Sequence, residues 1–85
     1  MRKFGLNPDN MTQLLQNLPV GTRCRVVSLE GDTAHTRRLM ELGMVPGVWC
    51  TVIRKAPFGG PLEVALEVSR LGVRPTNDLR IYVEA

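Results

Sequence analysis

Apolar and polar residues alternate along much of this 85-residue chain, and this pattern predicts β-strands. The predicted strands are short and rich in β-branched residues, and they cover residues 22–29, 48–56, 62–68, 71–73 and 79–85. Residues 62–68 alternate most cleanly, with apolar side chains facing inward as far as Val68 and two glutamates facing outward. Val27 and Leu29 break the alternation of the first strand, which predicts a bulge or a strand covered on both faces.

Two segments show helical spacing instead. Residues 8–18, "PDNMTQLLQNL", place apolar residues three and four positions apart, which predicts a short N-terminal helix. A second helix is expected after Gly31, with Asp32 and Thr33 as turn and cap, and it runs to about Leu42.

The stretch "RLMELGMVPG" predicts how the second helix ends. Gly43 fits the position after the helix, where the backbone turns left-handed and a side chain is unfavourable. Met44 would then pack on Leu39, as in a Schellman-type end. Pro46 and Gly47 follow as a type II turn. We therefore expect a helix stop joined to a sharp turn that directs the next strand into the core.

Five short strands with one helix after the first predict a mainly β fold, a small and strongly bent antiparallel barrel. We divide the chain into an N-terminal extension, residues 1–10, and one barrel domain, residues 11–85. No stretch of about 18 apolar residues occurs, so we expect no membrane insertion. The first residues do not resemble a signal peptide, and the cytoplasm is the expected location.

Composition and motifs argue against catalysis. The carboxylates are scattered, and the glycine-rich loop at 57–61 lacks the lysine of a phosphate-binding loop, so we expect no enzyme and no cofactor. Cys24 and Cys50 are expected to be reduced thiols in the core, and His35 an exposed residue of the second helix. Together they are the only weak candidates for a metal site. A net charge of +3 is too small to require nucleic acid.

What remains is a surface suited to contact. A hairpin loop sealed by two prolines presents Phe58 at an expected exposed tip, and Arg54 and Lys55 lie beside it. For Met44 the core is the favoured interpretation, and a contact role is the alternative. The candidate partner-binding residues are Leu42, Gly43, Met44, Pro46, Gly47, Phe58, Arg54 and Lys55. A weak homo-oligomer through an exposed edge strand is a further expectation.

The combined motif resembles the FeoA family. The matching positions lie in "RLMELGMVPG" and "VWCTVIRKAPFGGPLEVALEV", and the similarity covers about residues 11 to 84. The resemblance implies an SH3-like β-barrel with a helical insertion. It also implies a non-enzymatic accessory role in bacterial ferrous iron transport, in which the chain binds the cytosolic region of a FeoB-like transporter and so lies peripherally at the inner membrane.

Two other functions stay open. Similar SH3-like barrels form the C-terminal part of iron-dependent repressors, which would make the chain a module that binds or senses a transition metal ion. The arginines suggest RNA binding, which ranks lowest because the chain has too few aromatic residues to stack successive bases.

Overall fold

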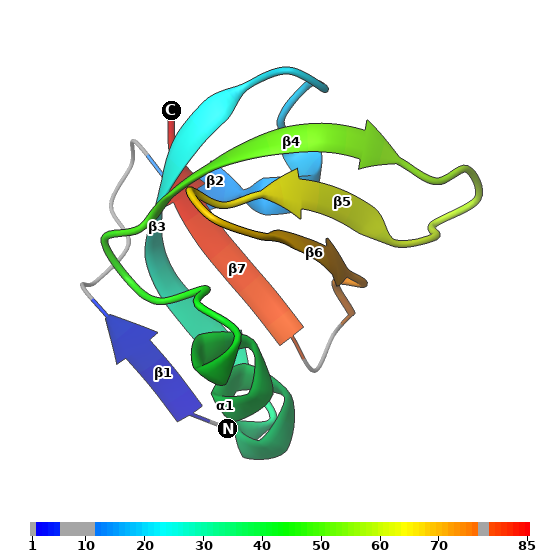
Figure 1. Ribbon diagram of the computed structural model, residues 1–85. Coiled ribbons are helices and arrows are strands. Elements are labelled where there is room, and N and C mark those ends of the chain that lie inside the picture. The colour runs from blue at the N-terminus through cyan, green and yellow to red at the C-terminus, as the bar shows by residue number, and fades with distance from the viewer. Residues whose placement is uncertain (1, 6–11, 77–78) are drawn as a thin grey trace.

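A computed structural model describes residues 2–5, 12–76 and 79–85, and of residues 2–5 it describes the backbone. These ranges contain one sheet and one α-helix (Figure 1). The strands are β1 Arg2–Gly5, β2 Gln13–Leu14, β3 Arg23–Gly31, β4 Trp49–Lys55, β5 Leu62–Ala65, β6 Arg70–Val73 and β7 Leu79–Glu84. The helices are the 3₁₀ turn η1, Leu15–Asn17, and α1, Thr33–Glu41.

All strand pairs are antiparallel, in the order β2-β7-β3-β4-β5-β6. The long strand β3 organises the sheet. One of its edges pairs with β7, while the other pairs with β4 through its first residues and with β1 through its last four. The register against β7 shifts between Val26 and Ser28, so the predicted bulge is confirmed.

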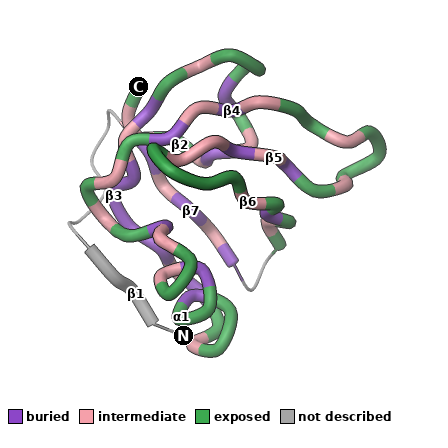
Figure 2. The backbone as a smooth tube through the Cα atoms, viewed as in Figure 1, coloured by how far each residue is buried: buried purple, intermediate pink, exposed green. Residues whose placement is uncertain are grey.

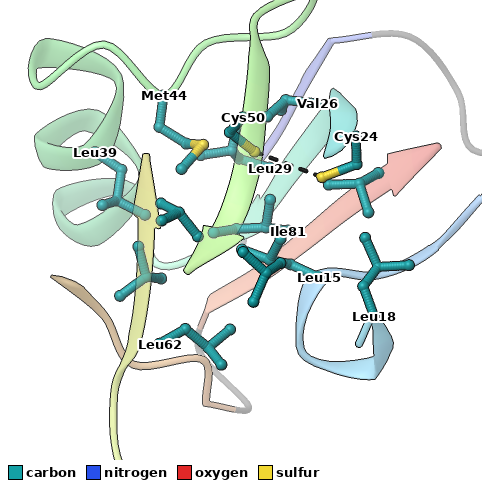
Figure 3. Packing of buried hydrophobic residues seen from close by; sticks show 14 of the residues in the cluster. Leu15, Leu18, Cys24, Val26, Leu29, Leu39, Met44, Cys50, Leu62 and Ile81 are labelled. Atoms are coloured by element: carbon teal, nitrogen blue, oxygen red, sulfur yellow. Dashed lines mark hydrogen bonds between the residues drawn. The ribbon is translucent and has the colours of Figure 1, made fainter. Parts of the chain in front are cut away.

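The sheet curls around a single core (Figure 2). Figure 3 shows most of this cluster in close-up. Its buried members come from η1, α1, the loops and strands β3 to β7: Leu15, Leu18, Cys24, Val26, Leu29, Leu39, Met44, Cys50, Val52, Leu62, Val64, Val73, Leu79, Ile81 and Val83. The mainly β class with one inserted helix is confirmed. An SH3-like small β fold fits this arrangement, although β2 and β6, at the two ends of the order, do not pair to close a barrel within the described ranges.

The predicted N-terminal helix is wrong where the structure describes it. Residues 13 and 14 pair with β7, Gln13 opposite Val83 and Leu14 opposite Tyr82, and only one 3₁₀ turn follows. A helix this short is marginal without tertiary support. Here strand pairing and the burial of Leu15 and Leu18 provide that support to a short strand and a 3₁₀ turn instead. The first part of the predicted helix, residues 8–11, lies outside the described residues.

The strand predicted over 62–68 ends early. β5 stops at Ala65, and the backbone N–H of Leu66 donates to the carbonyl oxygen of Ser69 at 2.7 Å. The chain must reverse there because Ala65 pairs with Arg70 of β6. Val68 is therefore almost fully exposed, and its predicted inward position is wrong.

The division at residue 10 stays a prediction, because residues 1 and 6–11 lie outside the described part. Residues 77 and 78 of the predicted turn before β7 lie outside it as well. Next to them, Thr76 forms an isolated antiparallel bridge with Leu79.

Candidate interaction surface

Helix α1 begins at a side-chain cap, as predicted. One carboxylate oxygen of Asp32, Oδ1, accepts hydrogen bonds from the backbone N–H of Ala34 at 2.7 Å and of His35 at 3.2 Å. These two hydrogen bonds lower the pKa of the Asp32 carboxyl below its ordinary value, and the bond from His35 has the larger effect. The cap fixes where the helix starts, and the helix then runs for nine residues, Thr33–Glu41.

The predicted helix end is confirmed in detail. The N–H of Met44 donates to the carbonyl of Leu39 at 3.0 Å, and the N–H of Gly43 donates to that of Met40 at 3.1 Å. Gly43 has φ +107°, a left-handed conformation that glycine alone adopts without strain. A Cβ built there would lie 3.2 Å from Cδ1 of Leu66, so the turn is packed closely against the segment between β5 and β6.

The type II turn is confirmed too. Gly47 has φ +94°, and the N–H of Val48 donates to the carbonyl of Val45 at 3.1 Å. Two more hydrogen bonds join the turn to β3. The N–H of Gly47 donates to the carbonyl oxygen of Val26 at 2.7 Å, and the N–H of Val26 donates to the carbonyl oxygen of Val48 at 2.9 Å. We call residues 42–48 the elbow. Its backbone is fixed at both ends, so its side chains are presented on a rigid frame.

The elbow and the first residue of β4 expose large apolar side chains. Leu42 is 43% exposed, Val45 37% and Trp49 45%, and we call these three residues the elbow face. The guanidinium of Arg23, on the neighbouring strand, lies 4.3 Å from the centre of the Trp49 ring. This cation–π contact restrains the indole ring, which nevertheless stays 45% exposed.

The surface is hollowed on both sides of the elbow. A groove of about 550 Å³ lies beside the start of β4, and Gly47, Trp49, Cys50 and Leu66 are among its lining residues. A shallower hollow of about 320 Å³ lies toward the helix and is lined by Arg37, Met40, Glu41 and Val45. Hollows flanking exposed apolar side chains are typical of contact surfaces.

The hairpin tip is a separate surface. Phe58 is fully exposed, as predicted, and its backbone has φ +58°. The elbow precedes β4 and the tip follows it (Figure 1). Seven residues of extended strand span about 20 Å, so the two surfaces are separate. Next to the tip, Lys55 Nζ donates to the carbonyl of Gln16 at 3.0 Å, and Arg54 Nε lies 3.7 Å from Glu63 Oε2.

The remaining candidates do not share one surface. Met44 is wholly buried, so it supports the elbow from inside, while Pro46 is half-buried at its turn. Cys24 and Cys50 lie in the core, and His35 is exposed at the start of α1 beside Asp32. Within the described residues, no three His, Cys, Asp or Glu side chains group as a metal site would require.

Comparison with protein families supplies the decisive observation. A family model described as the FeoA domain matches residues 13–85, nearly the whole chain. The chain belongs to the FeoA family. It therefore has a role in a ferrous iron transport system, and the family is known as a small accessory domain rather than an enzyme. FeoA proteins are associated with FeoB iron transport.

The other comparisons add little. No solved structure shows a significant match to the chain. In the part of this FeoA chain that the structure describes, no helix has the length and apolar character needed to cross a membrane.

Sequence reasoning missed one residue of the elbow face. Val45 lies within the candidate stretch from Leu42 to Gly47, but Trp49 was not a candidate, although strand alternation already places it on the face opposite Cys50 and Val52. Arg23 shows the same outward position on its own strand. Pairing of Arg25 with Trp49 sets the register that brings Arg23 and Trp49 together, and a single sequence does not reveal that register.

Proposed function

We propose that this FeoA chain is a non-enzymatic accessory protein that binds the cytosolic part of a FeoB-like ferrous iron transporter through its elbow face. It would act in the cytoplasm and lie at the inner membrane only through the transporter. The observation that supports this most is the set of exposed apolar side chains, Leu42, Val45 and Trp49, held on a backbone with fixed hydrogen bonds.

Energetics favour the elbow face over other exposed surfaces. Tryptophan and arginine are enriched among the residues that dominate binding energy, and Trp49 and Arg23 are already stacked. The helix-end bonds and the type II turn hold the elbow in one conformation before binding. A partner therefore does not have to order a flexible loop, which lowers the free-energy cost of association.

Phe58 is a second candidate contact. A fully exposed aromatic ring in left-handed backbone contributes no burial to the fold and adds strain of about 1–2 kcal/mol. A glycine or asparagine would suit this position better in an isolated chain. The strain is easier to understand if the ring inserts into a partner.

Calorimetric titration of the purified chain with the cytosolic region of the FeoB-like transporter from the same organism tests the proposal. We expect Val45→Asp and Trp49→Ala to weaken binding by about tenfold or more, which corresponds to about 1.4 kcal/mol. Val20→Asp is the matched control, because Val20 is also an exposed valine but lies between η1 and β3. We expect it to bind like the wild type.

Two outcomes would contradict the assignment of this surface. If both elbow variants bind like the wild type while their circular dichroism spectra show them folded, the elbow face is not the contact. If only Phe58→Ala weakens binding, the contact lies at the hairpin tip. An absence of wild-type binding would overturn the partner itself.

A further inference from the structure

Cys24 and Cys50 lie directly opposite each other on β3 and β4, although 26 residues separate them in the chain. Their sulfur atoms are 3.5 Å apart and share a hydrogen bond, drawn as the dashed line in Figure 3. Both thiols are free in this structure. Residues directly opposite in antiparallel strands have Cα atoms about 4.5–5.5 Å apart, which lies within the range that a disulfide spans.

The two cysteines differ in access. Cys24 is wholly buried, whereas Cys50 is 3% exposed and is one of the residues lining the 550 Å³ groove beside Trp49. A small uncharged oxidant can therefore approach Cys50 through the groove, whereas Cys24 does not line it. This asymmetry gives the two sulfur atoms different roles.

We propose that Cys24 and Cys50 form a redox-active pair, in which a hydroperoxide oxidises Cys50 first and Cys24 then closes a disulfide between β3 and β4. This site is independent of the proposed transporter contact. It is a modification site inside the sheet, adjacent to the elbow face.

The chemistry balances in two steps. The thiolate of Cys50 attacks one oxygen of hydrogen peroxide, the O–O bond breaks, and the product is a sulfenic acid with hydroxide as leaving group. Cys24 then loses its proton and attacks the sulfenic sulfur, forming the S–S bond and releasing a second hydroxide. The hydroxides take up the two thiol protons, so two thiols and one peroxide yield one disulfide and two waters.

Protonation of the pair agrees with this order. When Cys50 ionises, the thiol of Cys24 donates a hydrogen bond to it, which lowers the pKa of Cys50 below its ordinary value. The same hydrogen bond, together with burial, raises the pKa of Cys24 well above its ordinary value. These directions agree with oxidation that starts at Cys50, the cysteine that borders the groove, while Cys24 keeps its proton until the second step.

Intact-mass spectrometry of the full chain treated with excess hydrogen peroxide tests the proposal. We expect the wild type to lose both titratable thiols and about 2 Da without forming a dimer, and dithiothreitol to reverse the change. Trp49 is the only tryptophan in the chain and directly precedes Cys50, so its fluorescence reports on the reaction. If the folded chain keeps both thiols, or links two molecules instead, the proposal is wrong.

Two single variants test the order of the steps. Cys24→Ala removes the resolving thiol, so we expect dimedone to trap a sulfenic acid at Cys50. Cys50→Ala is the matched control, in which Cys24 should stay reduced in the folded chain and react only in denaturant. Trapping of Cys24 in the Cys50→Ala control, together with no trapping of Cys50 in the Cys24→Ala variant, would overturn the order. The wild-type mass measurement decides the pairing itself even if a variant does not fold.

Discussion

Replacing Gly43 by alanine tests whether the elbow depends on both its backbone conformation and its close packing. Gly47 is the matched control, because both glycines have positive φ, +107° and +94°, but only Gly43 has a neighbour in the way. A Cβ at Gly43 would lie 3.2 Å from Cδ1 of Leu66, whereas a Cβ at Gly47 would meet nothing within 4 Å. Comparing the two variants therefore separates backbone strain from crowding.

The expected magnitudes follow from these contacts. A side chain in left-handed backbone costs about 1–2 kcal/mol, and alanine recovers about 0.5 kcal/mol because it restricts the unfolded chain. We therefore expect Gly47→Ala to lower the free energy of unfolding by about 1 kcal/mol. Gly43→Ala should lower it by about 0.5 kcal/mol more, since the end of the Leu66 side chain can move but loses packing when it does.

Urea denaturation followed by circular dichroism measures both changes. Gly72→Ala provides the baseline, since that strand residue has neither positive φ nor a neighbour close to its Cβ. In a Leu66→Ala background the extra cost of Gly43→Ala should disappear, and the double-mutant cycle isolates the contact. The reasoning fails if the Gly43→Ala variant is as stable as the Gly72→Ala variant. It also fails if Gly43→Ala costs as much stability in the Leu66→Ala background as in the wild type.

Three further predictions concern other parts of the chain. Phe58→Gly should raise the free energy of unfolding by up to about 1 kcal/mol in urea denaturation, because it relieves left-handed strain at a residue that is not buried; a loss of stability would show that the ring packs on the fold. The Asp32 carboxylate has a lowered pKa, so its charge stabilises the fold above the ordinary carboxyl pKa, and this contribution is lost as the pH falls through the folded value. The thermal stability advantage of the wild type over Asp32→Asn should therefore shrink between about pH 6 and about pH 2, and a constant difference would contradict the cap charge. Glu84→Gln should cost less than about 1 kcal/mol, because its ion pair with Arg25 is half exposed; a larger loss in urea would mean that this pair matters to the fold.

The elbow could be predicted from the sequence because local residues determine it. Gly43 and Gly47 take conformations that few other residues adopt, and Pro46 presets the turn, so these residues specify the turn locally and the hydrogen bonds with Val26 then hold it against β3. The strands with strict alternation were predictable for a similar reason. In β7, Leu79, Ile81 and Val83 are all buried, as their spacing indicates.

The errors arise where distant pairing decides the structure. Leu14 belongs to a segment whose apolar residues have helical spacing, but its backbone pairs with Tyr82 at the other end of the chain. Val68 continues the alternation of its strand, but the pairing of β5 with β6 makes the chain reverse before it. Local patterns carry no information about these partners, so periodicity alone assigns both residues to the wrong environment.

The candidate site was predictable only in part. Local sequence indicated the elbow and the exposed Phe58, but it did not indicate that the length of β4 separates them into two surfaces. It also placed Cys24 and Cys50 in the core as independent residues. Only the register of β3 against β4 makes them neighbours, and the same register places Arg23 beside Trp49.

The most direct test of the central claim is a two-dimensional ¹H–¹⁵N NMR titration of the labelled chain with the transporter's cytosolic region. Because the chain has one tryptophan, the indole N–H of Trp49 gives a single signal that reports on the elbow face. We predict that this signal and the amides of Leu42 and Val45 shift or broaden on binding. Unchanged elbow signals, with shifts confined to β6 or to the hairpin tip, would contradict the account.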